Sequence, residues 1–333
     1  EFSFIDGSSL LDSMASICNN LGMPAIALTD HGNMYGAIDF YNACKTKNIK
    51  PIIGCEFYIA PKSRFDKDPS YSYDHLTVIA KNNLGYSNLI KLVSKGNLEG
   101  FYYRPRIDKE ILKEHSEGLI VLSGCPSAEL FKKIVSGDEK SIMDTIDWYK
   151  EVFGDDYYLE IMRHEHVDNQ EKVNQWIINN YKQLNVKIVA TNDNHYETKN
   201  DYEKEILLKN VRSGSSNPRS DILEDNSYYI ASPEEMREKF KDIPEACDNT
   251  LEIADKCNIE IDFSGTMIPE FKTPENKDSF SYLKELCEEG LIRKFPEPSE
   301  EITDRLNYEL SVIKETDFAD YFLVVWDIFK FVN

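Results

Sequence analysis

The stretch AIALTDHGNM at residues 25–34 joins a short apolar run directly to an acid, an imidazole and a glycine. Its first five residues have the length of a buried strand, and Pro24 and Gly32 limit that strand at its two ends. A strand that ends in Asp30 and His31 would place two metal-binding side chains at the edge of a sheet. In a simpler interpretation Asp30 caps the following helix and His31 is solvated. The stretch by itself leaves both interpretations open.

Similar apolar runs recur over the first 200 residues and alternate with segments of helical periodicity. Strands are predicted at 25–29, 51–60, 76–80, 118–124, 157–162 and 187–191, and helices at 34–48, 84–98, 127–135, 139–152 and 168–184. Repeated strand–helix alternation indicates a parallel sheet, either open or closed into a barrel. Because several strands end in polar residues, we favour a barrel, whose site gathers at the C-terminal strand ends.

The sequence changes character after about residue 213. SPEEM at 232–236 is predicted to begin a helix, since Glu235 follows Ser232 by three residues. The proline-containing segment 263–279 is predicted to be a linker. We therefore expect a large domain over residues 1–270 and a mostly helical segment over 276–333, which closes on the apolar DYFLVVWDIFKFVN. Such a surface would need covering, so we expect the natural chain to continue.

The composition is strongly acidic, with a formal net charge of −21. Taken alone, this charge is a poor match to duplex DNA, but it suits a site that gathers carboxylates around cations. It also suits a piece of a larger protein whose basic surface lies elsewhere. No apolar run reaches membrane-spanning length, and the N-terminus has no signal-peptide pattern. Seven cysteines without a CxxC pair favour a reducing compartment, so we expect a cytoplasmic protein that does not contact a membrane.

Several metal-binding side chains follow or interrupt the predicted strands. Asp193 and His195 follow one strand, and their spacing places both side chains on one side of an extended backbone. Glu56 is the lone charge in IIGCEFYIA, where a buried carboxylate needs a cation or a hydrogen-bond partner. The further candidates are Asp6, His31, His75 and Cys125. Together they supply the nitrogen, oxygen and sulfur ligands that suit Zn, Mn or Fe.

Each candidate also has a structural interpretation. Asp6 and Asp193 could be turn residues, and Cys125 a small buried apolar side chain. His75 begins its run, which is the wrong end for a site at the C-terminal strand ends. A nucleophilic Cys125 is a weaker alternative, since no histidine lies near it in sequence. The remaining histidines lie in polar segments and are predicted at the surface: His115, His164 and His166.

Longer motifs resemble a known family. They are LGMPAIALTDHGNMYGAIDFYNACKTKNIKPIIGCEFYIAP (21–61), HLTVIAKNNLGYSNLIKLVS (75–94), GFYYRPRIDKEIL (100–112), EGLIVLSGC (117–125) and IVATNDNHY (188–196). These motifs resemble the N-terminal domain of the bacterial DNA polymerase III alpha subunits, which are C-family replicative polymerases, and that domain belongs to the PHP (polymerase and histidinol phosphatase) superfamily. The resemblance continues through 242–261 to 315–331, which resembles the opening of the polymerase palm.

The resemblance implies an α/β fold, a distorted (β/α)7 barrel of the PHP type, followed by a helical start of the palm. It also implies a metal cluster that holds Zn or Mn, with two or three ions when complete. The implied ligands are Asp6, His31, Glu56, His75, Cys125, Asp193 and His195, with Asp30 orienting His31. The family's first motif, His-x-His, is expected a few residues before Glu1 and is missing here, so we expect a truncated PHP domain.

The resemblance further implies a parent enzyme that synthesises DNA on a primer–template with deoxynucleotides and Mg. Its catalytic residues are expected beyond Asn333, and its partners are the sliding clamp and other replisome subunits. The PHP domain is implied to be a metal-dependent phosphoesterase, such as a 3′–5′ exonuclease, or a structural platform. Two alternatives stay open: a free-standing PHP phosphatase for a small phosphorylated metabolite, and a scaffold that binds metal only for stability.

Overall fold

The structure is a computed structural model of the 333-residue chain. It describes every residue except 1, 4–6, 71, 214–225, 265–268 and 333. The chain forms two compact units, Glu1–Ile261 and Asp262–Asn333. None of the described helices has both the length and the apolarity that a membrane crossing requires.

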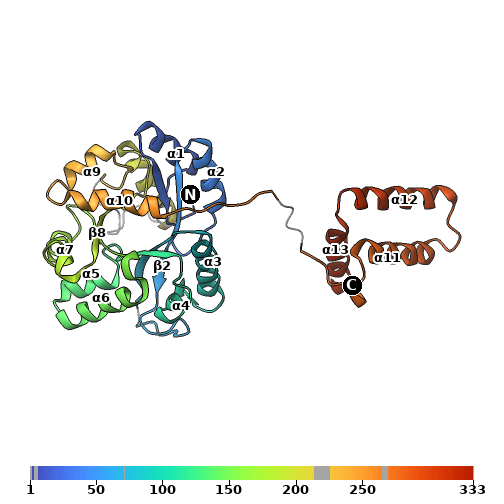
Figure 1. The fold of residues 1–333 in the computed structure, drawn as a ribbon, viewed down its shortest axis with the longest axis horizontal. Helices are drawn as coiled ribbons and strands as arrows, with labels where there is room; N and C mark the ends of the chain where they lie inside the picture. Colours follow the sequence, from blue (N-terminus) through green and yellow to red (C-terminus); the bar gives the residue numbers. More distant parts are fainter. Residues whose placement is uncertain (1, 4–6, 71, 214–225, 265–268, 333) are drawn as a thin grey trace. The chain divides into compact units, whose positions relative to one another are not determined.

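The first unit is built on one curled sheet with helices packed around it (Figure 1). Its strands are β1 (Ala25–Leu28), β2 (Lys50–Ile59), β3 (Asp74–Ala80), β4 (Phe101–Tyr102), β5 (Arg104–Ile107), β6 (Leu119–Leu122), β7 (Tyr157–Ile161) and β8 (Lys187–Ala190). Its helices are α1 (Leu11–Asn20), α2 (Ala37–Thr46), α3 (Asn83–Leu98), α4 (Lys109–Glu114), α5 (Glu129–Ser136), α6 (Glu139–Phe153), α7 (Gln170–Leu184), α8 (Tyr202–Ser213), α9 (Pro233–Lys239) and α10 (Pro244–Lys256). The α/β class is confirmed, and each predicted strand and helix occurs within a few residues of its expected bounds.

The prediction of a parallel sheet is wrong for part of the sheet. The strand order is β4-β5-β2-β3-β6-β7-β8, with β1 also paired to β2. β3 runs antiparallel to both β2 and β6, whereas the pairs β1–β2, β6–β7 and β7–β8 are parallel. Among the described residues no helix separates β2 from β3, and an antiparallel return needs no helical crossover. In the described part of the chain β1 pairs only with β2 and β8 only with β7, so the barrel is open between them.

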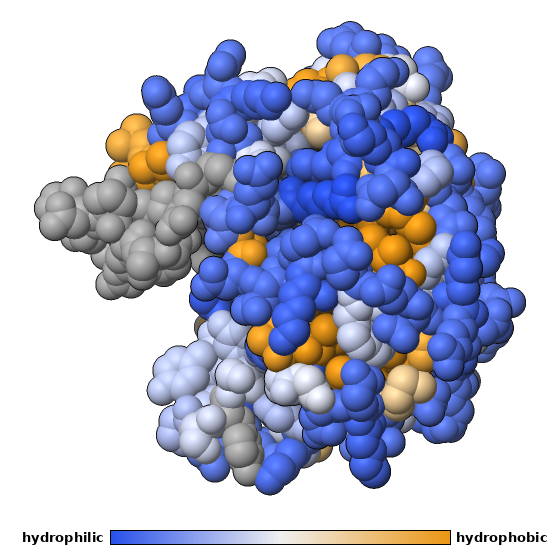
Figure 2. Space-filling view, turned by 90° about the vertical axis from the view of Figure 1, so that its left-hand side faces the viewer, coloured by the Kyte–Doolittle hydropathy of each residue, from blue (hydrophilic) through white to orange (hydrophobic). Residues whose placement is uncertain are grey.

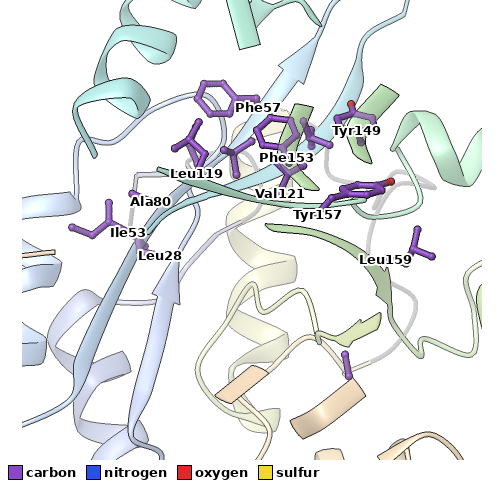
Figure 3. Close-up of a cluster of buried hydrophobic side chains, with 14 of the residues drawn as sticks. Leu28, Ile53, Phe57, Ala80, Leu119, Val121, Tyr149, Phe153, Tyr157 and Leu159 are labelled. Carbon is purple, nitrogen blue, oxygen red and sulfur yellow. The ribbon is translucent and has the colours of Figure 1, made fainter. Parts of the chain in front are cut away.

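Alternate strand residues are buried on opposite faces of the sheet. Ile53 and Val78 belong to the larger core cluster under the outer helices, while their neighbours Ile52 and Ile79 pack in a second cluster with Ile253 of α10. Figure 3 shows the larger cluster, in which Phe57 and Tyr157 lie among other strand and helix side chains. Strands buried on both faces read as continuous apolar runs, which explains the sequence pattern.

Local signals set several helix ends. Asn82 accepts a hydrogen bond from the Gly85 N–H at 3.0 Å and caps α3. Ser232 and Glu235 form the predicted capping box at the start of α9.

The second unit is helical, with α11 (Ser279–Lys294), α12 (Glu300–Glu315) and α13 (Ala319–Val332). It has its own small core of Leu283, Ala319 and Leu323. Much of the apolar surface of α13 is exposed, including Phe331 at 91%.

Candidate metal centre

His31 lies where the chain leaves β1 and passes along the edge of β2. It forms a parallel bridge with Glu56, whose backbone N–H donates to the Asp30 carbonyl at 3.1 Å. Gly32 then has φ +64°, and a methyl group there would lie 2.7 Å from Pro105 Cγ. Glycine suits this left-handed, crowded position, so Gly32 permits the turn that follows His31 at the sheet edge.

Three of the predicted ligands converge. His75 Nδ1 lies 2.7 Å from Glu56 Oε1, and His31 Nδ1 lies 3.5 Å from Glu56 Oε2. One ligand atom from each of the three side chains falls within 4.8 Å of the others. Cys125 Sγ lies 3.5 Å from Glu56 Oε1 and 3.4 Å from His75 Nδ1, so a fourth candidate adjoins the group.

The direction of β3 explains why His75 joins this group. His75 pairs with Tyr58 in the antiparallel ladder between β3 and β2. Because β3 runs opposite to β1 and β2, its first residues lie at the edge where those strands end. The objection that His75 stands at the wrong end of its run therefore disappears.

Asp193 and His195 follow β8 and lie next to each other. Their side chains lie 3.4 Å apart, from Asp193 Oδ1 to His195 Nε2. Burial opposes the charge of Asp193, but His195, His164 and His31 hold the pKa of Asp193 well below its usual range. Asp193 has φ +47°, a left-handed conformation that Asp tolerates better than most residues.

One cavity of about 430 Å³ connects the two groups. The candidate ligands that line it are His31, Glu56, Cys125, Asp193 and His195. Asp6 lies outside the described residues. Asp30 is buried and accepts a hydrogen bond from Ser3 Oγ at 2.6 Å, and Ser3 Oγ in turn accepts from the His31 backbone N–H. This chain links Asp30 to the His31 backbone, while its action on the imidazole stays a prediction.

Glu160 is a site residue that the sequence analysis missed. It is buried in β7, lines the cavity, and accepts hydrogen bonds from the Gly124 N–H at 3.0 Å and the Thr191 hydroxyl at 2.7 Å. Burial, with Asp193 and Glu56 nearby, raises the pKa of Glu160 to about 7. It is the lone charge in YYLEIM, the same signal that singled out Glu56.

The surface prediction for three histidines is wrong for His164. Only 3% of His164 is exposed, and its ring stacks on Tyr228 at 3.9 Å. His115 and His166 are half-buried. The chain between β7 and α7 looks polar in sequence, but it folds back over Tyr228, a contact that local sequence does not reveal.

The charge and the donor types of the site fit a cation. Four acidic residues line the cavity, namely Asp30, Glu56, Glu160 and Asp193, and Arg237 is the one Lys or Arg among the described residues that line it. Buried carboxylates need compensation by a cation or by hydrogen bonds. Burial and the Glu56 carboxylate also raise the pKa of Cys125 well above its usual range, which disfavours a free nucleophilic thiolate.

The structure thus gathers imidazole, carboxylate and thiol groups at one edge of a curled α/β sheet. Residues 1–164 match the PHP domain family, and residues 281–333 match the family described as the bacterial DNA polymerase III alpha NTPase domain. Together with the donor set, the PHP match implies metal binding. The chain as a whole is homologous to the N-terminal region of bacterial DNA polymerase III alpha subunits.

Curated relatives support this homology along the full chain. The DNA polymerase III subunit alpha of Borreliella burgdorferi is 41% identical over 341 residues, which cover 100% of this chain and 30% of that protein. Those of Chlamydia pneumoniae and Treponema pallidum are 37% and 39% identical and cover 98% of this chain, with 31% and 28% of their own lengths matched. The chain thus spans about a third of the length of these relatives.

A solved structure described as a metal-dependent phosphoesterase from Bifidobacterium adolescentis is 13% identical, with a TM-score of 0.38 over 71% of this chain and 93% of that one. This similarity is too low to bear on fold or function.

Proposed function

We propose that this chain is the N-terminal part of the alpha subunit of a replicative DNA polymerase, and that its PHP domain is a metal-dependent phosphoesterase that removes nucleotides from DNA 3′ ends. The observation that carries the second part is the convergence of His31, Glu56 and His75 beside Cys125. In this proposal residues 1–270 are the PHP domain and 276–333 begin the palm. The full-length protein would act with Mg on primer–template DNA and deoxynucleotides, alongside the sliding clamp and other replisome subunits.

His31, Glu56, His75 and Cys125 would hold Zn or Mn, and the thiol favours Zn. Asp193 and His195 on the other wall of the cavity would hold a further ion. A cation bound there supplies Lewis-acid stabilisation of charge on a phosphoryl oxygen.

Neighbouring rings hold two of the imidazoles in place. The Tyr58 ring stacks on His31 at 5.9 Å, and the Tyr73 ring stacks on His75 at 6.0 Å with an interplanar angle of 2°. Aromatic pairs have preferred geometries, so these rings restrict the orientation of the two imidazoles. The chain's own groups therefore prepare the site before any ligand enters.

The free-standing phosphatase is less well supported, because residues 281–333 match a polymerase-specific family. A metabolite phosphatase has no need of such an extension.

The test compares Glu56→Gln with Glu114→Gln, an exposed glutamate of α4 that serves as the control. After incubation with Zn or Mn and removal of free metal, elemental analysis should show at least one bound ion in the unsubstituted 333-residue chain (the parent chain) and in the control. The Glu56→Gln variant should bind Zn or Mn about tenfold more weakly or worse, since the amide replaces a charged ligand. Absence of metal in all three proteins would refute the site.

Cleavage is measured separately, on a single-stranded oligonucleotide with a labelled 5′ end. Shortening from the 3′ end that His31→Ala abolishes supports the phosphoesterase. Cleavage by this chain should be weak, because the expected His-x-His motif is missing from it, so the same oligonucleotide is also given to a longer chain that carries the motif. If that longer chain retains metal but never shortens the oligonucleotide, the enzymatic part of the proposal is wrong, and a metal-stabilised platform replaces it.

A further inference from the structure

The hairpin of β4 and β5 lies against the candidate metal centre. Pro105 packs so closely on Gly32 that a methyl group at Gly32 would lie 2.7 Å from Pro105 Cγ. Arg104 Cζ lies 5.8 Å from the centroid of the Tyr58 ring, and that ring stacks on His31. The guanidinium of Arg104 and the imidazole of His31 therefore both lie against the Tyr58 ring.

The hairpin presents an aromatic side chain to solvent beside this arginine. Tyr103, the turn residue, is 75% exposed, and Phe101 is 55% exposed. Tyr103 has φ +59°, a conformation that is a genuine outlier for a bulky residue. Strained backbone of this kind persists only where the surroundings enforce it, and it clusters at functional sites.

Tyr102 and Arg106 pack under the turn. The Tyr102 and Tyr103 rings lie 4.6 Å apart in an edge-to-face arrangement. Arg106 is buried, lies 5.2 Å from the Tyr102 ring centroid, and donates to the backbone carbonyls of Gly100 and Asp66. These contacts pack under the turn, while Tyr103 itself is exposed.

An exposed aromatic ring next to an arginine suits a nucleic-acid single strand. Unpaired bases stack on aromatic side chains regardless of sequence, and a guanidinium pairs with the phosphodiester. The chain as a whole carries a net charge of −21, and Figure 2 shows a largely hydrophilic surface on the face it draws. The net negative charge disfavours a general attraction to DNA, so binding has to rely on local contacts such as these.

We propose that Tyr103 and Arg104 form an entry platform that binds the single-stranded end of a DNA substrate next to the metal centre. A base stacks on Tyr103, and Arg104 binds the phosphodiester that leads into the cavity. This inference rests on the proposed phosphoesterase function and assigns its substrate contacts to the β4–β5 hairpin.

The test measures fluorescence anisotropy of a labelled oligothymidylate with the 333-residue chain at low salt, in EDTA so that no cleavage occurs. Tyr103→Ala should weaken binding by about 5- to 100-fold, the range for loss of one base–aromatic stack. Tyr103→Phe keeps the ring and should bind like the parent chain. Arg104→Gln should weaken binding and make it less dependent on salt, because one phosphate contact is lost.

The chain offers a matched control in the second unit. Tyr308 of α12 is 60% exposed, and Arg305 Cζ lies 5.5 Å from its ring centroid. Tyr308→Ala removes a similar ring beside an arginine and should leave binding unchanged.

Three results would overturn the platform: Tyr103→Ala binding as tightly as the parent chain, Tyr308→Ala weakening binding equally, or duplex DNA binding as well as the single strand. The proposal of the platform and the proposal of the phosphoesterase can be refuted independently of each other. Binding that depends on Tyr103, together with no cleavage in Zn or Mn by a longer chain that carries the His-x-His motif, overturns only the phosphoesterase. Cleavage by that longer chain that is indifferent to Tyr103 and Arg104 overturns only the platform.

Discussion

The Glu160 carboxylate accepts hydrogen bonds from two loops of the candidate metal centre. One oxygen accepts from the N–H of Gly124, which precedes Cys125, and the other accepts from the hydroxyl of Thr191, which precedes Asp193 by two positions. Gly124 has φ +95°, and a methyl group there would lie 2.7 Å from Ala128 Cβ. The carboxylate thus holds two candidate ligands from different strands in fixed relation.

The pKa of Glu160 predicts a pH dependence of stability. Burial raises this pKa to about 7, so between about pH 4.5 and pH 7 the folded, metal-free protein holds a proton that the unfolded chain has released. Its free energy of unfolding should therefore fall as pH rises through that window. Glu160→Gln should reduce this fall by on the order of 1–3 kcal/mol, seen as a flatter plot of melting temperature against pH in EDTA.

The same variant should bind Zn or Mn about 10- to 100-fold more weakly, because a residue that orients the ligands is altered. Glu114→Gln is again the control. An unchanged pH profile, together with unchanged metal affinity, would remove Glu160 from the site.

At the scale of elements, the sheet depends on close approaches between backbones. Gly85 in the first turn of α3 lies against Gly118, which precedes β6, and a methyl group at Gly85 would lie 1.9 Å from the Gly118 carbonyl oxygen. Gly96 in the same helix is different, because its nearest neighbour, Ile107 Cγ2, would lie 3.4 Å from an added methyl group. Gly85 therefore permits the close contact between α3 and the residue before β6, whereas Gly96 only lowers the helix propensity of α3.

The two glycines predict opposite effects of alanine. Gly85→Ala should destabilise the protein by about 2 kcal/mol or more, since backbone has to move to admit the methyl group. Gly96→Ala should stabilise it by up to about 1 kcal/mol through higher helix propensity. Urea denaturation of both variants measures this, and equal midpoints would contradict the packing of α3 described above.

At the scale of the whole molecule, the two units have separate cores. The cluster around Leu283, Ala319 and Leu323 involves only residues of the second unit, and the candidate ligands belong to the first. A ligand that binds only the folded state stabilises the unit that holds it.

Metal should therefore protect one unit alone. On addition of Zn or Mn, amide hydrogen exchange should slow in peptides from β1, β2 and β3, with a gain of about 2.7 kcal/mol at a hundredfold excess over the dissociation constant. Exchange in peptides from α11, α12 and α13 should not change. Equal protection of both units would show either a site elsewhere or coupling between the units.

The sequence by itself determined the elements and most of the candidate ligands. Strands buried on both faces require continuous apolar runs, so a lone Glu56 or a terminal His31 stands out from its neighbours. The capping box at Ser232 is equally local, because all of its partners lie within one turn of helix.

Only the tertiary structure decided how these residues meet. The direction of β3 depends on pairing with β2 and β6, and that pairing carries His75 to the edge where β1 and β2 end. The burial of His164 depends on Tyr228, 64 positions away in the chain. Periodicity reports which face of an element is buried, but the partner across that face is set by long-range packing, which a local pattern does not contain.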